Sequence, residues 1–210
     1  MIKILIADDH PVVRRGLKQI ISENPDMVVA GEAGDGLEVL SQVRKNDYDL
    51  VLLDISMPAG SGLSILSQIK SEKTELPVLI ISIYPESQYA VRVLKAGASG
   101  YLAKDSAPEE LIKAIRAVVS GKKYVSAGLA QELASKLGTA ARNLPHETLS
   151  NREFDILCLI ASGKTNKGMA RDLFLSPKTV STYRLRILNK LGLKTDAELI
   201  RYVIENRLLG

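Results

Sequence analysis

The sequence lacks tryptophan, and only 4% of its 210 residues are aromatic, so a folded core would rest on Leu, Ile, Val and Ala. A single cysteine, Cys158, excludes an internal disulfide and a cysteine-built metal site. It lies in an apolar helical stretch, where we expect it to fill core space. The sequence has no run of eighteen apolar residues and no signal-peptide pattern at its start. These absences predict a cytoplasmic protein that does not enter a membrane.

Charge is distributed unevenly along the chain. Residues 1–125 contain 15 Lys and Arg against 16 Asp and Glu, whereas residues 145–210 contain 11 against 7. A basic domain often binds nucleic acid, although many basic surfaces only face solvent. The sequence therefore suggests two domains, of which the second is a candidate for binding nucleic acid.

Short apolar runs alternate with stretches of helical periodicity over the first 120 residues. Five runs have strand length: Lys3–Ala7, Val28–Ala30, Leu50–Leu53, Val78–Ile81 and Gly100–Leu102. Strands alternating with helices predict an α/β domain with a doubly wound, five-stranded parallel sheet. In such a sheet the functional groups gather beyond the carboxyl ends of the strands.

Only helical signals follow a polar stretch that contains glycine and proline. We expect a first domain at 1–121, a linker at 122–146 with a candidate short helix at 129–137, and a second domain at 147–210. Capping residues at Ser150, Thr165, Ser176 and Thr195 predict four helices in the second domain. The short turn before Ser176 predicts an all-α helix-turn-helix domain.

Polar side chains follow four of the predicted strands. Asp8 and Asp9 follow the first strand, Asp54 ends the third, Ser82 follows the fourth and Lys104 the fifth. Three carboxylates close together repel one another unless a cation intervenes, and oxygen ligands suit Mg²⁺. A carboxylate beside a metal, a lysine and a hydroxyl is what phosphoryl transfer requires.

These motifs resemble the signature of response-regulator receiver domains over about residues 1–121. The matching residues are Asp8-Asp9, Asp54 followed by Met57-Pro58 and Gly62, Ser82, and Tyr101-Leu102-Ala103-Lys104. The resemblance implies a flavodoxin-like receiver in which a sensor histidine kinase phosphorylates Asp54. It also implies that Asp9, Asp54 and the backbone carbonyl of Ser56 hold Mg²⁺, with Asp8 supporting the metal through water. Lys104 would contact the phosphoryl group, while Ser82 and Tyr101 would move together as a switch.

All charged residues from Lys178 through Lys194 are basic. Helical spacing places Lys178, Ser181, Thr182 and Leu185 near one face, as contact with a DNA groove requires. The motifs 149–153, 163–167, 175–180 and 190–191 resemble the LuxR-type domain, so the whole chain resembles the NarL/FixJ-type response regulators. The resemblance implies that the following residues contact double-stranded DNA: Ser181, Thr182 and Leu185 at the bases, and Lys178, Thr179, Arg184 and Lys190 at the backbone.

Two residues depart from the LuxR-type pattern. Gly168 stands where the family usually has Glu, which should weaken its helix by up to about 1 kcal/mol. Tyr183 stands where His is common. Neither departure changes the expectation of DNA binding, but both make the preferred DNA sequence harder to infer.

The combined motifs predict a transcription regulator and not an enzyme. Phosphorylation would favour a homodimer and control DNA binding, and RNA polymerase is a further candidate partner. We expect Leu199, Ile200 and Val203 of the last helix to contribute to pairing of the second domains.

Other readings of the same residues stay open. The chain could act through protein contacts without phosphorylation, or use Asp54 as the nucleophile of a Mg²⁺-dependent phosphohydrolase. The helical domain could bind a protein instead of DNA. His10 could add a metal ligand, although Pro11 after it favours a place at the start of the first helix.

Overall fold

The computed structural model describes residues 1–57, 62–84, 86–131, 144–173, 175–206 and 208. The chain forms two compact units, Met1–Ala130 and Gln131–Gly210. Within the described ranges, no helix combines the length and apolar character that crossing a membrane requires.

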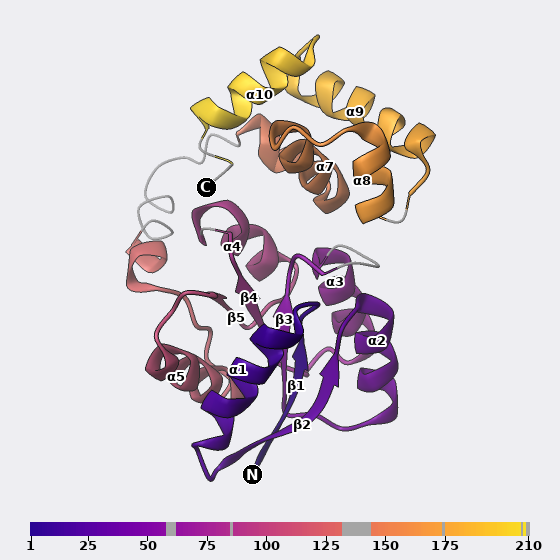
Figure 1. Cartoon of the computed structure of the whole chain (residues 1–210). Helices are drawn as coiled ribbons and strands as arrows, with labels where there is room; N and C mark the ends of the chain where they lie inside the picture. Colours follow the sequence, from indigo (N-terminus) through magenta and orange to yellow (C-terminus); the bar gives the residue numbers. More distant parts are fainter. Residues whose placement is uncertain (58–61, 85, 132–143, 174, 207, 209–210) are drawn as a thin grey trace. The chain divides into compact units, whose positions relative to one another are not determined.

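The first unit is a five-stranded parallel sheet with helices on both faces (Figure 1), which confirms the predicted fold class. The strand order is β2-β1-β3-β4-β5. The strands are β1 (Ile2–Ala7), β2 (Met27–Ala33), β3 (Leu50–Asp54), β4 (Val78–Ser82) and β5 (Gly100–Ala103). The helices are α1 (Pro11–Ser22), α2 (Gly36–Lys45), α3 (Gly62–Glu72), α4 (Glu86–Lys95) and α5 (Pro108–Val119).

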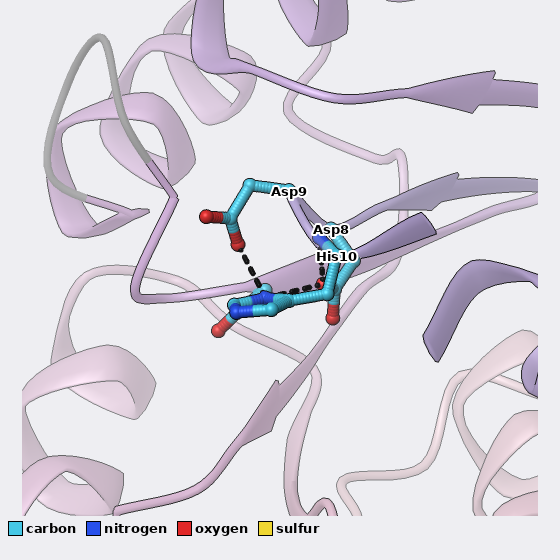
Figure 2. A group of neighbouring side chains, drawn as sticks. Asp8, Asp9 and His10 are labelled. Carbon is cyan, nitrogen blue, oxygen red and sulfur yellow. Dashed lines mark hydrogen bonds and ion pairs between the residues drawn. The ribbon is translucent and has the colours of Figure 1, made fainter. Parts of the chain in front are cut away.

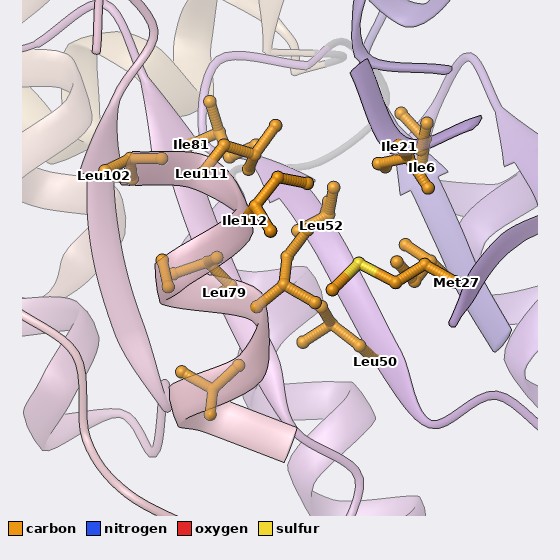
Figure 3. Packing of buried hydrophobic residues seen from close by; sticks show 14 residues of the cluster. Ile6, Ile21, Met27, Leu50, Leu52, Leu79, Ile81, Leu102, Leu111 and Ile112 are labelled. Carbon is orange, nitrogen blue, oxygen red and sulfur yellow. The ribbon is translucent and has the colours of Figure 1, made fainter. Parts of the chain in front are cut away.

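The central strands β3 and β4 are buried along their whole length, as expected for a parallel sheet that is covered on both sides. Side chains that alternate along the strands pack against α5 and α1 in one apolar cluster (Figure 3). Leu52 and Leu79 from the sheet and Ile112 from α5 lie within this cluster. Burial on both faces fixes the register of each strand, and so the positions at which its carboxyl end presents side chains.

The chain returns to the sheet after α5. Tyr124 forms a parallel bridge beside β5, where its N–H donates to the Ser99 carbonyl and its carbonyl accepts from the N–H of Tyr101, both at 3.0 Å. Residues 127–131 are helical, and the rest of the short helix predicted at 129–137 falls outside the described residues. The segment that the sequence suggests as the start of a linker therefore covers the β5 edge.

The second unit contains a 3-10 turn at Pro145–Thr148 and four described helices: α7 (Asn151–Ala161), α8 (Asn166–Asp172), α9 (Pro177–Leu191) and α10 (Asp196–Glu205). Each helix begins at a predicted cap, because the side chain of Ser150, Thr165, Ser176 or Thr195 accepts a hydrogen bond from a backbone N–H in the first turn. Gly192 ends α9 in the left-handed conformation that glycine adopts readily.

The core of the second unit takes up two residues that the sequence suggested for pairing. Leu199 and Val203 of α10 are fully buried, and Cys158 is buried as predicted. Leu199 and Val203 therefore pack inside the unit and expose no surface to a second copy, and pairing through α10 stays a prediction. Ile204, on the exposed side of α10, is 65% exposed.

Candidate functional site

Acidic side chains gather at the carboxyl edge of the sheet, as the strand-end rule predicts. Asp8 follows β1 and Asp54 ends β3, and each is only 1% exposed. Lys104 reaches both from beyond β5, with its Nζ 2.6 Å from Asp8 Oδ2 and 2.6 Å from Asp54 Oδ2. Three separate strand ends therefore bring one ammonium and two buried carboxylates together.

Burial and ion pairing oppose each other at this cluster. Burial raises the pKa of Asp54, against the hydrogen bonds from Lys104 and from the backbone N–H of Ser56, the latter 2.9 Å from Asp54 Oδ1. Burial lowers the pKa of Lys104, but Asp54 and Asp8 together raise it above its ordinary value. The lysine therefore stays charged and neutralises part of the buried negative charge.

The loop after β3 has a tight geometry that depends on Gly62. Its N–H donates to the Ile55 carbonyl at 3.1 Å, and an added Cβ would lie 2.4 Å from Ile55 Cα. No larger residue fits without moving the backbone next to Asp54. The Pro58 of the same motif lies outside the described residues.

Asp9 and His10 complete the acidic cluster on its outer side (Figure 2). His10 is the N-cap residue of α1, as its neighbour Pro11 predicts, and its Nδ1 lies 2.8 Å from Asp9 Oδ1. That oxygen is nevertheless buried and accepts no hydrogen bond of good geometry from the described residues. Asp8, Asp9, His10 and Asp54 each offer a ligand atom within 4.8 Å of the others. A carboxylate oxygen that is buried among further carboxylates and accepts no hydrogen bond of good geometry is in an environment that favours a cation.

Ser82 and Tyr101 are connected through the backbone of Tyr84. The N–H of Tyr84 donates to Ser82 Oγ at 3.0 Å, and the hydroxyl of Tyr101 donates to the Tyr84 carbonyl at 2.6 Å. Ser82 and Tyr101 are both fully buried, and burial raises the pKa of the Tyr101 hydroxyl, which stays protonated. The sequence gives no signal for this connection, because it uses main-chain groups that every residue has.

The helix α9 presents part of its predicted DNA-contact set to solvent. Lys178, Thr182 and Leu185 are exposed, and Leu185 is 62% exposed although it is apolar. Thr179 and Ser181 are half-buried. An exposed stripe that combines a cation, a hydroxyl and an apolar side chain suits contact with a DNA groove.

Two other cations of the predicted set are engaged within the unit. Arg184 Nε lies 2.6 Å from Asp196 Oδ1, at the start of α10. Lys190 Nζ lies 2.7 Å from Glu153 Oε2, whose side chain is only 4% exposed. Both positions follow the basic pattern of α9, but their side chains pair with acids from other helices.

The comparisons with known proteins agree with this architecture. Residues 4–116 match the family model "Response regulator receiver domain", and residues 147–203 match "Bacterial regulatory proteins, luxR family". The chain is 40% identical over 214 residues to Oxygen regulatory protein NreC of Staphylococcus aureus, covering 99% of both chains. It is 36% identical over 209 residues to Response regulator UvrY of Escherichia coli K12, covering 99% of this chain and 96% of UvrY.

A solved structure is also similar over nearly the whole length. It is RcsB from Salmonella enterica serovar Typhimurium, bound to promoter rprA in the presence of the phosphomimetic BeF3⁻. The TM-score is 0.70 at 25% identity, and the match covers 97% of this chain and 98% of RcsB.

Proposed function

The chain belongs to the response regulators that join a receiver domain to a LuxR-type DNA-binding domain, and from this premise we propose that phosphorylation of Asp54 controls its binding to promoter DNA. Members of this family are transcription regulators, which places the chain outside the enzymes that turn over an external substrate. The main support for this proposal is that Lys104 Nζ lies 2.6 Å from a carboxylate oxygen of both Asp8 and Asp54.

Asp54 is the proposed phosphoacceptor. An oxygen of its carboxylate attacks the phosphorus of a phosphohistidine on a sensor histidine kinase, the P–N bond breaks, and an aspartyl phosphate forms. Lys104 already contacts Asp54, so its ammonium can form an ion pair with the phosphoryl oxygens once Asp54 is phosphorylated. Since Lys104 also touches Asp8, it need not leave the site to do so.

Asp9, Asp54 and the backbone carbonyl of Ser56 are the proposed holders of Mg²⁺, with Asp8 supporting them through water. The buried Asp9 Oδ1, which accepts no hydrogen bond of good geometry, and the surrounding carboxylates fit a hard cation that prefers oxygen. When bound, the metal neutralises charge that develops on the phosphoryl oxygens. His10 Nδ1 beside Asp9 is less suited to this ion, since nitrogen is a poor ligand for Mg²⁺.

The proposed switch runs through Tyr84. A phosphoryl group on Asp54 attracts the Ser82 hydroxyl, whose oxygen now accepts from the Tyr84 N–H. Any shift of this backbone acts on Tyr101, because the Tyr101 hydroxyl donates to the same residue's carbonyl. The two residues therefore move together as a unit, and the surface of α4 and β5 changes with them.

The second unit is the proposed reader of double-stranded DNA. Ser181, Thr182 and Leu185 would face bases, and Lys178 and Thr179 would contact the backbone. A homodimer would place two copies of α9 about one DNA turn apart on a two-fold site. We place this regulator in the cytoplasm, where the DNA, the kinase domain and RNA polymerase as a further candidate partner are accessible.

The experiment compares binding to genomic DNA fragments with and without acetyl phosphate and Mg²⁺, for the natural chain and Asp54→Ala. Asp47→Ala is the matched control, since Asp47 is a fully exposed aspartate of the same unit. We expect tighter binding with the donor for the natural chain and for Asp47→Ala but not for Asp54→Ala. Equal DNA affinity of the natural chain with and without acetyl phosphate would refute the proposed switch. No DNA binding under any condition would favour a protein partner for the second unit.

A further inference from the structure

A chain of polar contacts joins three helices of the second unit. Asn166 begins α8, and its Nδ2 donates to Ser181 Oγ on α9 at 3.2 Å. Its Oδ1 accepts from Arg184 Nη1 at 3.3 Å, and Arg184 in turn pairs with Asp196 at the start of α10. The four side chains are half-buried, so water competes only in part for these bonds.

The direction of each hydrogen bond in this network follows from its members. A guanidinium group only donates, so the side of Asn166 that faces Arg184 must be its oxygen, and its amide nitrogen must face Ser181. Ser181 therefore accepts a bond from Asn166. Its own proton goes to the Pro177 carbonyl, 3.0 Å away on the same helix. A hydroxyl has one proton and two lone pairs, so only one lone pair is left for a ligand.

We propose that Ser181, whose proton goes to the Pro177 carbonyl, is an acceptor-only contact that selects an exocyclic amino group of adenine or cytosine, and that Asn166 and Arg184 are the residues that position it. This inference rests on the proposed function, since it assumes that α9 enters the major groove. There the adenine N6 and cytosine N4 amino groups are the donors, whereas guanine and thymine present acceptors. Opposite guanine or thymine, the acceptor-only Ser181 oxygen would face another acceptor, and both would lack a hydrogen bond. Such a pairing costs binding free energy, so adenine or cytosine is preferred.

The same network gives Arg184 a role other than the DNA-backbone contact that the LuxR-type resemblance implies. Its guanidinium pairs with Asp196 and holds Asn166, so its charge is already compensated within the unit. Lys178 differs, because it is exposed and has no ion pair among the described residues. The two cations should therefore respond differently to salt: a phosphate contact contributes to the salt dependence of binding, and a positioning residue does not.

The first experiment selects binding sites from randomised DNA duplexes with the full chain, acetyl phosphate and Mg²⁺, and repeats the selection with Ser181→Ala. The base pair that loses its preference in Ser181→Ala is the one that Ser181 contacts. There we replace adenine by purine, or cytosine by 2-pyrimidinone, which removes only the amino group. We expect the natural chain to bind this duplex about fivefold to tenfold more weakly and Ser181→Ala to bind both duplexes equally.

The Asn166 variants test positioning directly. Asn166→Ala leaves the Ser181 proton on the Pro177 carbonyl but removes the hydrogen bond that fixes the Ser181 hydroxyl, so the preference at that base pair should weaken. Asn166→Asp should keep the preference, because the new carboxylate can take the Ser181 proton in place of the Pro177 carbonyl and so keeps Ser181 an acceptor. A merely structural Asn166 would lower affinity for all duplexes alike. Loss of binding on replacing guanine or adenine N7 by carbon, with the amino group unimportant, would show that Ser181 donates and overturn the proposal.

The second experiment measures affinity against salt concentration for Lys178→Ala, Arg184→Ala and Asp196→Asn. We expect the logarithmic slope to fall by about 1 for Lys178→Ala and to stay unchanged for the other two, which should lose affinity together. A lower slope for Arg184→Ala, with Asp196→Asn binding more tightly, would make Arg184 a phosphate contact and overturn the proposal. If Arg184→Ala does not fold, the affinity and salt slope of Asp196→Asn alone test the role of Arg184. A natural chain that selects no sequence would instead refute the proposed function itself.

Discussion

The start of α8 offers a clear test of how this unit is stabilised. Thr165 caps the helix by accepting from the N–H of Gly168 at 3.1 Å, which is half of a capping box. In α7 and α10 the residue at the equivalent third position is Glu153 or Glu198, and its carboxylate returns a bond to the backbone N–H of the cap. Glycine has no side chain to do so. We predict that Gly168→Glu completes the box and stabilises α8.

The size of the effect follows from three contributions. Replacing glycine within a helix gains about 0.5–1 kcal/mol. A carboxylate in the first turn adds about 0.3–1 kcal/mol through the helix dipole, and the returned hydrogen bond adds about 0.5 kcal/mol net. The site can accept a side chain, because an added Cβ would lie 3.4 Å from Thr165 Oγ1 and Gly168 is not among the glycines of positive φ. We expect a gain of about 1–2 kcal/mol in total, allowing for incomplete additivity.

The assay is amide hydrogen exchange of α8 in the full chain, because it reports the local opening free energy of one helix. A gain of this size slows exchange about fivefold to thirtyfold. Gly168→Ala controls for helix propensity alone, and Gly168→Gln keeps the returned hydrogen bond without the charge. If Gly168→Glu slows amide exchange of α8 no more than Gly168→Ala does, the capping explanation is refuted. Faster exchange in Gly168→Glu than in the natural chain would show that α8 does not begin at Thr165.

Three further predictions concern single contacts. Lys104→Met should cost about 3 kcal/mol of unfolding free energy by leaving buried carboxylates without their cation, and Mg²⁺ should restore part of it in urea titrations; equal losses with Mg²⁺ and with EDTA would contradict this. Gly62→Ala should cost about 1–3 kcal/mol and weaken Mg²⁺ binding in calorimetry, whereas Gly16→Ala, inside α1 and with nothing within 4 Å of an added Cβ, should gain about 0.5–1 kcal/mol and leave Mg²⁺ binding unchanged. Lys190→Met should cost about 1 kcal/mol at neutral pH, after allowance for the exposure of Lys190. Burial raises the pKa of Glu153, but Lys190 and Ser150 hold it below the ordinary 4.5, so this stabilisation is present above that pH and lost as pH falls. A difference between the two chains that persists at low pH in denaturant titrations would rule the ion pair out as its cause.

The number of strands and their parallel arrangement could be predicted because the central strands are uninterrupted apolar runs. The edge strand β2 could not be bounded in this way. It extends over Met27–Ala33, beyond the predicted 28–30, and its second half contains Gly31 and Glu32. Its pairing with β1 also shifts register between Ile4 and Leu5. One side of an edge strand makes no hydrogen bonds to a neighbouring strand, so polar residues are tolerated there. The apolar pattern of β2 therefore ends before the strand does.

The bridge at Tyr124 is a second feature that the sequence could not predict. It joins one residue to the β5 edge, and a single bridged residue has no periodicity for a sequence pattern to detect. The acidic cluster was predictable for the opposite reason. Five polar residues stand at strand ends, and a parallel sheet brings all such ends to one edge whatever the loops between them do.

The cations of α9 show where reasoning along one helix stops. Between Lys178 and Lys194 no acid interrupts the basic residues, so the local pattern makes each cation a candidate for a phosphate contact. The acids that pair with two of them come from other helices: Asp196 lies 12 residues from Arg184, and Glu153 lies 37 from Lys190. Helical periodicity contains no information about such partners. The excess of basic residues in 145–210 therefore overstates the charge that is free to meet DNA. Because the salt slope counts only the phosphates that are neutralised, it should be smaller for this chain than the number of basic residues on α9 suggests.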